Sequence, residues 1–274
     1  MGTLAGIVLF NPDIARLKEN YTAIKGQVDK VVFFNNGSKN IADIKRTFPE
    51  TEDLQYLDSN DNMGIAFALK AIMNYAIQFE YQWVLTLDQD SVCSASLVET
   101  YLKYANIERV GILTCNIVDR NFSEIEEKKV APYTEIKQCI TSASLINVEA
   151  YKHTSGFDEK MFIDSVDFDL CINMRLNGYK IIKVNFDGIL HEVGHGKNVR
   201  FLNKNYIVYN HSPFRNYYIA RNRFYLLKKY PGELSLIKEV LHECRLEVMI
   251  LLFEDDRIKK LKQRWRGIKD SKKL

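Results

Sequence analysis

The chain has 274 residues, of which 46% are hydrophobic and 27% are charged. A chain of this length and apolar content can bury a sizeable core, which argues against a disordered protein. Its 38 basic and 35 acidic residues leave a formal net charge of +3, and so balanced a total argues against nucleic acid as the partner.

The sequence shows no pattern typical of secretion or of a membrane span. Its five cysteines are widely spaced and form no Cys-x-x-Cys pair, so neither a disulfide framework nor a zinc site is indicated. No basic segment and cleavage site precede the first strand-like run, and the longest apolar stretch is far shorter than the roughly 20 residues of a transmembrane helix. We expect a cytoplasmic protein that is soluble or peripheral to a membrane.

Short β-branched and aromatic segments alternate with segments of helical period in the first 115 residues. This alternation predicts an α/β fold with a mostly parallel, doubly wound nucleotide-binding sheet, whose ligand lies beyond the carboxyl ends of the strands. The predicted strands are 4–10, 30–35, 54–57, 83–87 and 110–114, and the predicted helices are 14–25, 63–79 and 95–104.

The pattern loosens after residue 115. A charged loop over 119–129 is followed by a predicted strand over 138–146, a short helix near 148–153 and a strand over 180–190. From Ser212 onward the chain reads as helices, with a break at Pro231 and Gly232. We therefore expect an α/β domain of residues 1–211 and a helical C-terminal region of residues 212–274.

The C-terminal tail is rich in basic residues from 257 to 273. Its apolar residues recur at spacings of 3, 4 and 3, which places them on one face of a helix, as an interfacial membrane anchor requires. A helix packed on its own domain, or one that forms a dimer interface, explains the pattern equally well. The apolar residues are Ile258, Leu261, Trp265 and Ile268.

Two carboxylates separated by one residue, Asp88 and Asp90, follow the predicted strand over 83–87. At this edge of a parallel sheet such a pair can hold Mg²⁺ or Mn²⁺ against the oxygens of a diphosphate. A solvated turn can carry the same three-residue pattern.

A second acidic cluster, formed by Asp164, Asp167 and Asp169, opens a predicted helix. A helix cap explains one acid but not three. One of these carboxylates could therefore act as the base that deprotonates an acceptor hydroxyl.

Basic side chains complete the candidate site. In the run from His191 to Gly196 the glycines favour a loop over a zincin helix, so one histidine is either an additional metal or phosphate ligand or a structural residue. Arg215, Arg221 and Arg223 suit diphosphate oxygens, because guanidinium groups bind phosphate bidentately, although a salt-bridged surface helix is the alternative.

In this order, the motifs resemble those of the inverting family-two glycosyltransferases, and within them the bacterial rhamnosyltransferases that use dTDP-L-rhamnose. The resemblance runs from Ala5 to about Tyr230. Besides the acidic, histidine and Arg221-Asn222 motifs it includes Val8-Leu9-Phe10-Asn11-Pro12, Phe34-Asn35-Asn36-Gly37-Ser38, Asn60-Asp61-Asn62-Met63-Gly64-Ile65-Ala66, Thr141-Ser142-Ala143-Ser144-Leu145-Ile146 and Gly156-Phe157-Asp158-Glu159.

The resemblance implies a GT-A-like fold, a nucleotide-sugar donor and a divalent metal, Mg²⁺ or Mn²⁺. It implies Asp167 as the catalytic base, while Val166 in place of the family's usual acid leaves Asp164 as a second candidate. The remaining implied roles are donor binding by Asn11, Asn35, Asn62, Asp88 and Arg221, and metal binding by Asp88, Asp90 and His191.

The expected reaction is inverting transfer of L-rhamnose from dTDP-β-L-rhamnose to a glycan or lipid-linked glycan at the inner face of the plasma membrane. A UDP-hexose is the alternative donor, because Asn35 stands where the family usually has Asp. A nucleotidyltransferase would need a Gly-rich basic loop near the N-terminus, which residues 10–13 do not provide. A non-catalytic membrane-surface scaffold is the other alternative.

Overall fold

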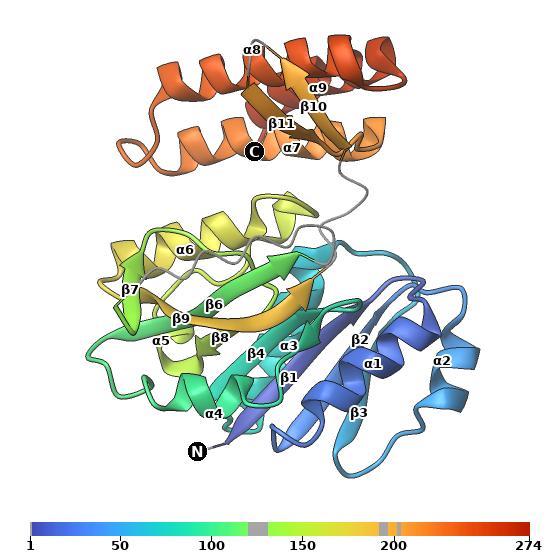
Figure 1. The fold of residues 1–274 in the computed structure, drawn as a ribbon, viewed down its shortest axis with the longest axis vertical. Helices are drawn as coiled ribbons and strands as arrows, with labels where there is room; N and C mark the ends of the chain where they lie inside the picture. Colours follow the sequence, from blue (N-terminus) through green and yellow to red (C-terminus); the bar gives the residue numbers. More distant parts are fainter. Residues whose placement is uncertain (1, 120–130, 192–196, 202–203) are drawn as a thin grey trace. The chain divides into compact units, whose positions relative to one another are not determined.

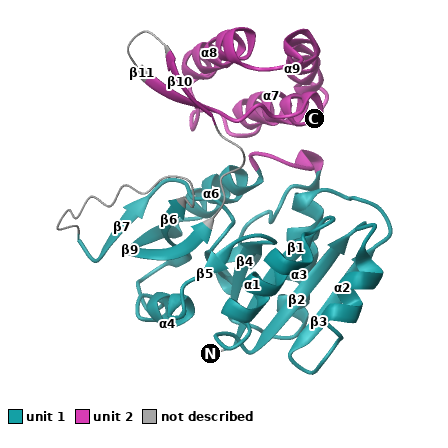
Figure 2. Ribbon diagram, turned by 45° about the vertical axis from the view of Figure 1, so that its right-hand side comes forward, with its two compact units in different colours: residues 1–159, 166–192 teal, residues 160–165, 193–274 magenta. Residues whose placement is uncertain are grey.

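A computed structural model describes residues 2–119, 131–191, 197–201 and 204–274. The chain forms two compact units (Figure 2): unit 1 is Met1–Glu159 with Val166–Glu192, and unit 2 is Lys160–Ser165 with Val193–Leu274. The boundary between the two units therefore lies between residues 192 and 193, whereas the sequence predicted it between residues 211 and 212. The short internal segment 160–165 also belongs to unit 2.

Unit 1 is built on a mixed sheet with the strand order β3-β2-β1-β4-β8-β6-β9-β5, and β7 pairs with β9 (Figure 1). The strands β1, β2, β3 and β4 are mutually parallel, and β6 is parallel to β9, whereas β8 is antiparallel to both of its neighbours. The bounds are β1 Thr3–Leu9, β2 Lys30–Asn36, β3 Leu54–Ser59, β4 Trp83–Asp88, β5 Val92–Cys93, β6 Val110–Asp119, β7 Tyr133–Ile136, β8 Ser144–Asn147 and β9 Lys180–His191.

Helices cover both faces of this sheet. All seven residues of β1 are buried, as expected for a central strand whose two faces are both covered. Ile7 of β1 and Phe33 of β2 pack in one core with Leu17 and Ile44 from the helices on that face. The helices are α1 Ile14–Ile24, α2 Ile41–Thr47, α3 Ile65–Gln78, α4 Leu97–Leu102, α5 Val148–Lys152 and α6 Val166–Leu176, with a 3₁₀ turn at Glu159–Met161.

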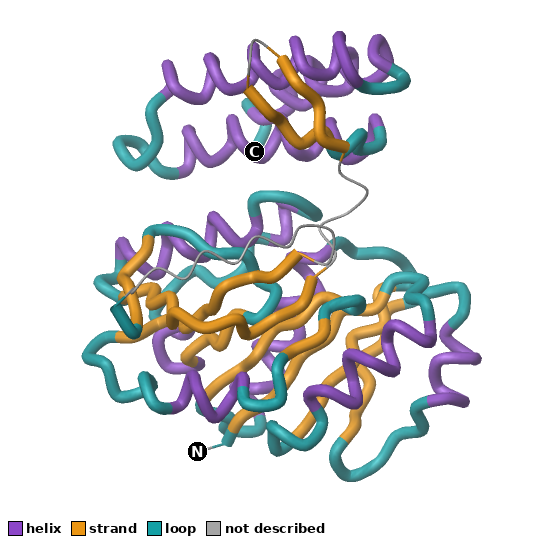
Figure 3. Tube along the Cα trace, viewed as in Figure 1, coloured by secondary structure: helices purple, strands orange, loops and turns teal. Residues whose placement is uncertain are grey.

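Unit 2 combines three helices with an antiparallel ribbon in the part of the chain that is described (Figure 3). Ser212 caps the first helix, since its hydroxyl accepts a hydrogen bond from the amide of Arg215 at 3.2 Å. The expected break at Pro231 and Gly232 separates the first and second helices. The elements are β10 Lys197–Phe201, β11 Lys204–Val208, α7 Pro213–Lys229, α8 Leu236–Phe253 and α9 Arg257–Ser271.

A buried ion pair joins the three helices of unit 2. Arg264 of α9 donates to both carboxylate oxygens of Glu243 of α8, each at 2.6 Å, and to the side-chain oxygen of Asn216 of α7 at 2.8 Å. The helices α7 and α9 lie so close that a Cβ at Gly267 would stand 2.3 Å from the carbonyl oxygen of Tyr217. Among the helices that the structure describes, none is both long enough and apolar enough to cross a membrane.

Candidate active site

The carboxyl ends of β1, β2, β3 and β4 meet at one edge of the sheet. In the register of the sheet, Asn35 of β2 pairs with Asp58 of β3, and Asp88 of β4 pairs with Val8 of β1. Because parallel strands end at the same edge, polar side chains from distant parts of the sequence gather there. This edge is where the sequence predicts the donor.

Asparagine side chains organise the loops after β1 and β2. Asn35 accepts a hydrogen bond from the amide of Ser38 at 2.9 Å and donates to Asp58 at 3.1 Å. Asn11, which has a left-handed backbone (φ 49°), accepts from the amide of Lys39 at 2.8 Å. Asn11 and Asn35 therefore brace the same loop from two strands.

Asn62 belongs to the loop after β3. Its side-chain oxygen accepts hydrogen bonds from Asn36 at 3.1 Å and from the amide of Gly64 at 3.0 Å. The loop of Gly37 approaches so closely that a Cβ there would stand 2.6 Å from the carbonyl carbon of Asp61, and Gly37 has φ +76°. Asn11 and Asn62 thus lie in loops, and Asn35 at the end of β2, and hydrogen bonds connect these segments to one another.

Asp58 was not selected from the sequence. Its carboxylate accepts hydrogen bonds from Asn35 and from Lys45, whose ammonium lies 2.7 Å away. A signal was present, since Asp58 directly follows the predicted strand 54–57 and precedes the Asn60 to Ala66 motif. Its pairing with Asn35, however, depends on the register of β2 and β3.

Asp88 ends β4, and Asp90 follows in the turn; both are half-buried. The buried Asn20 of α1 donates to the backbone carbonyl of Asp88 at 2.6 Å, and the amide of Asp88 donates to Ser142 at 3.3 Å. The side-chain oxygen of Gln89 accepts from the amide of Phe10 at 2.9 Å. Contacts from three segments therefore fix the turn that carries the two acids.

The acid pair fits a magnesium-like ion. The Asp90 carboxylate makes no hydrogen bond or ion pair with any residue that the structure describes, so its oxygens are available to a cation. The described residues contain no cluster of three or more His, Cys, Asp or Glu side chains placed to hold a metal. Two carboxylates are sufficient for Mg²⁺, which keeps several waters and takes its other ligands from substrate phosphates.

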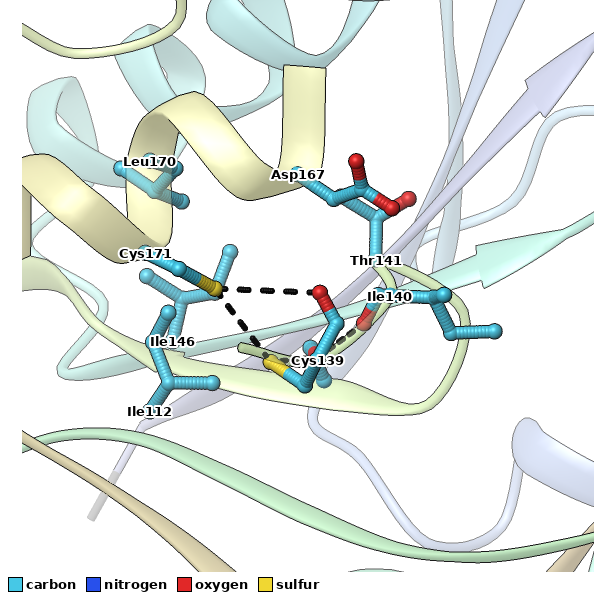
Figure 4. Close-up of a pocket in the computed structure, with 9 residues that line it drawn as sticks. Ile112, Cys139, Ile140, Thr141, Ile146, Asp167, Leu170 and Cys171 are labelled. Carbon is cyan, nitrogen blue, oxygen red and sulfur yellow. Dashed lines mark hydrogen bonds between the residues drawn. The ribbon is translucent and has the colours of Figure 1, made fainter. Parts of the chain in front are cut away.

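Asp167 lies in the first turn of α6 and lines a small pocket of unit 1 (Figure 4). One carboxylate oxygen accepts from the amide of Phe168 at 2.9 Å. The Cys171 sulfur, one turn farther along α6, lies 3.7 Å from the Cys139 sulfur. The pocket is formed by Ile112, Cys139, Ile140, Thr141, Ser144, Ile146, Asp167, Leu170 and Cys171.

The Cys171 thiol of this pocket is buried. The neighbouring Cys139 thiol and burial raise the pKa of Cys171 well above its ordinary value. Cys171 therefore does not compete with Asp167 as a proton acceptor at neutral pH.

Asp164 is held in a different way from Asp167. The guanidinium of Arg215 contacts both of its carboxylate oxygens, through Nε at 3.2 Å to each and through Nη2 at 3.0 Å. Arg215 lies in the first turn of α7, and both residues belong to unit 2. Both oxygens of the Asp164 carboxylate therefore already accept hydrogen bonds from a side chain of the same unit.

The three arginines of α7 do not form one cationic group, because each has its own partner. Arg223 pairs with Glu239, and Arg215 pairs with Asp164. Arg221 donates to the carbonyl oxygens of Lys160 at 2.5 Å and of Met161 at 3.0 Å. Through these contacts Arg221 fixes the backbone of residues 160 and 161. Its contact with the donor diphosphate stays a prediction.

His191 is the last residue of β9. Its side chain and the following residues 192–196, which include His195, lie outside the part of the chain that the structure describes. The predicted metal contact of His191 therefore stays a prediction.

Comparisons with known proteins agree with this fold. The family described as "Glycosyl transferase family 2" matches residues 6–167, more than half of the chain. The dTDP-rhamnosyl transferase RfbF of Shigella flexneri is 26% identical over 275 residues, which cover 94% of this chain and 91% of that protein.

Solved structures of glycosyltransferases with the GT-A fold resemble this chain. TarS 1–349 of S. aureus superimposes with a TM-score of 0.63 at 12% identity, covering 99% of this chain and 81% of TarS 1–349. GalNAc-T7 with UDP, GalNAc and Mn²⁺ gives a TM-score of 0.64 at 12% identity, covering 100% of this chain and 56% of that one. The predicted α/β class with a mostly parallel GT-A-like sheet is thereby confirmed, and the chain belongs to glycosyl transferase family 2.

Proposed function

We propose that this protein transfers L-rhamnose from dTDP-β-L-rhamnose to a hydroxyl group of a cell-surface glycan precursor, with inversion at the anomeric carbon. The observation that carries the proposal is the pair of half-buried carboxylates, Asp88 and Asp90, at the edge where four parallel strands end beside Asn11 and Asn35. The choice of rhamnose draws support from the likeness to the Shigella flexneri enzyme.

Asp88 and Asp90 would hold Mg²⁺ or Mn²⁺ together with the donor diphosphate, with His191 as a further ligand. When bound, the ion supplies positive charge against the negative charge that develops on the leaving nucleoside diphosphate. Asn11, Asn35 and Asn62 would bind the nucleotide, and Arg221 would contact the diphosphate end. Because Asn35 already binds Ser38 and Asp58, we expect it to shape the nucleotide site mainly by fixing this loop.

Asp167 would accept the proton of the acceptor hydroxyl as that oxygen attacks the anomeric carbon. A new bond forms between the acceptor oxygen and the anomeric carbon, while the bond to the diphosphate oxygen breaks on the opposite face. A β-linked donor then gives an α-L-rhamnoside. Asp164 is the weaker candidate because Arg215 occupies both of its oxygens.

A UDP-hexose is the second candidate donor. It is favoured by Asn35, which stands at the usual position of an Asp, and by TarS 1–349, whose complex with UDP-GlcNAc has a TM-score of 0.62 with this chain at 13% identity. The chemistry at Asp88, Asp90 and Asp167 would be the same for either donor.

The acceptor would be a glycan or lipid-linked glycan, reached at the inner face of the plasma membrane. Trp265 and Ile258 of α9 support this location, since their side chains are 63% and 62% exposed. Exposed Lys262 and Lys269 share their face of the helix and suit anionic lipid headgroups. A dimer through the same face is the alternative.

Vesicle sedimentation tests the membrane contact. Wild-type protein should bind vesicles that contain phosphatidylglycerol and not vesicles of phosphatidylcholine alone, and Trp265→Glu should abolish binding. Binding that Trp265→Glu leaves unchanged would refute this surface, and a concentration-dependent dimer that Trp265→Glu disrupts would favour the dimer.

Titration calorimetry tests the donor. The panel is dTDP-rhamnose, UDP-glucose, UDP-galactose and GDP-mannose, each with and without Mn²⁺ or Mg²⁺. We expect binding of dTDP-rhamnose that requires the metal and that Asp90→Asn weakens strongly. The control Asp43→Asn, at an exposed acid of α2, should keep it. Preference for a UDP-sugar would overturn the donor but keep the mechanism, and absence of binding by every sugar would overturn the proposal.

A further inference from the structure

Three aromatic rings of unit 2 form a cluster that is open on one side. Phe162 stacks on Tyr218 with ring centroids 5.0 Å apart and an interplanar angle of 22°. Phe214 meets both rings edge to face, at 5.9 Å from Phe162 and 5.0 Å from Tyr218. Core rings are normally covered, but Phe214 is 58% exposed. The cluster therefore presents apolar ring surface to its surroundings.

The backbone holds Phe162 in an unusual conformation. Phe162 has φ 61°, and Asp164 and Ser165 have φ 66° and 64°. Left-handed backbone is disfavoured for bulky residues and persists only where neighbouring groups impose it, which is common at ligand sites. The position of the Phe162 ring is thus imposed on the chain.

Two side chains of α7 impose this conformation. The fully buried Asn222 amide donates to the carbonyl oxygens of Met161 at 2.8 Å, Ile163 at 2.7 Å and Asp164 at 2.8 Å. Arg221 donates to Met161 as well, and its guanidinium carbon lies 4.5 Å from the Tyr218 ring centroid. The rings of the cluster are thereby fixed in place before any ligand binds.

Polar groups border the rings. Arg215, the neighbour of Phe214 in α7, is 44% exposed and holds the carboxylate of Asp164. The site therefore combines a flat apolar surface with a fixed donor and acceptor at its side. A pyranose ring has the matching chemistry, because one face presents C–H groups while hydroxyl groups project from its edge.

We propose that Phe162, Phe214 and Tyr218 form a stacking platform for a sugar ring of the acceptor, with Arg215 and Asp164 bonding its hydroxyl groups. This inference rests on the proposed function, which requires a glycan acceptor. It gives that acceptor a recognisable chemistry: a sugar with one face free of axial hydroxyl groups.

Saturation-transfer NMR on the full chain tests the platform without donor. The probes are methyl α-L-rhamnopyranoside, methyl β-D-glucopyranoside and methyl N-acetyl-β-D-glucosaminide. At least one should bind wild-type protein, with saturation strongest on the C–H groups of one ring face. Phe214→Ala should weaken binding about 10-fold, Phe214→Trp should retain it, and Phe79→Ala, a 54% exposed ring of unit 1, should not change it.

Kinetics with dTDP-rhamnose give the second readout. Phe214→Ala should raise the KM for the acceptor and leave the KM for the donor unchanged. Absence of binding by every probe, or equal binding by wild type and Phe214→Ala, would overturn the platform even if transfer proceeds. Intact glycoside binding without any dTDP-rhamnose turnover would instead refute the proposed donor, so the two failures are distinguishable.

Discussion

Replacing Asp167 or Asp164 by Asn tests which of the two acids is the catalytic base that we propose. Asp167→Asn keeps the shape of the side chain and its contact with the amide of Phe168, but removes the proton acceptor. A positioned general base contributes about 10²- to 10⁴-fold, so kcat should fall by that factor, which corresponds to about 2.7 to 5.4 kcal/mol. Donor binding should be unchanged.

Asp164→Asn should have a much smaller effect. It breaks the contacts with Arg215, whose side chain is 44% exposed, and pairs that open to solvent contribute about 0.2 to 1 kcal/mol. The stability of the protein should fall by no more than this amount, and kcat should stay within about fivefold of wild type.

Single-turnover transfer from radiolabelled dTDP-rhamnose measures the chemical step, and calorimetry with the same donor measures its binding. Circular dichroism melts confirm that both variants are folded. A 100-fold loss in Asp164→Asn with near-normal turnover in Asp167→Asn would refute the assignment and move the base to Asp164.

Three further predictions concern stability and thiol chemistry. Arg264→Met should lower the free energy of unfolding by about 3 to 5 kcal/mol, because it leaves the buried Glu243 carboxylate without its ion-pair partner. The double variant with Glu243→Leu should recover most of that loss, as measured by urea titration. Burial, and then the charge of Arg215, lower the pKa of His211, so its unfolded state binds more protons. Stability should therefore decrease as the pH falls through about 6.5, and His211→Gln should flatten the decrease in melts from pH 7.5 to 5.5. Iodoacetamide at pH 7.5 should label exposed Cys244 first, as peptide mass spectrometry would show, and rapid labelling of buried Cys171 would contradict the described packing.

The parallel half of the sheet could be predicted closely from the sequence. The predicted strands 30–35 and 83–87 correspond to β2 at 30–36 and β4 at 83–88. These strands are buried on both faces, so each reads as one apolar run between turn residues, and the pattern needs no knowledge of its neighbours.

The antiparallel additions were harder to predict. A strand was expected over 138–146, but β8 begins at Ser144, because the hydroxyl of Thr86 binds the carbonyl of Thr141 and holds residues 141–143 in a turn. The ribbon of β10 and β11 was not predicted, since its short strands mix polar and apolar residues and carry little periodic signal.

In the site, too, the sequence could predict what depends on neighbouring residues but not the contacts between residues far apart in the chain. The positions of Asp88 and Asp90 follow from one strand and the turn after it, which the sequence describes locally. The contact between Asn35 and Asp58 depends on the register of two strands, and the pairing of Asp164 with Arg215 joins residues 51 apart. Local patterns could therefore identify candidate acidic residues, but only the structure could show that Asp164 forms an ion pair with Arg215.

The helix α9 shows why an amphipathic pattern alone does not identify the buried face. Its spacing of apolar residues suggested that Ile258 and Trp265 share a face, and both are indeed exposed. The face that packs inward is polar: Lys260 binds Glu254 at 2.8 Å, Arg264 binds Glu243, and Gly267 admits the backbone of α7. A charged face can be buried only where partners satisfy it, and these partners lie outside α9, so the pattern of the helix does not reveal them. Once they do, Ile258 and Trp265 are left exposed, and we predict that Trp265 contacts a membrane surface or a second molecule.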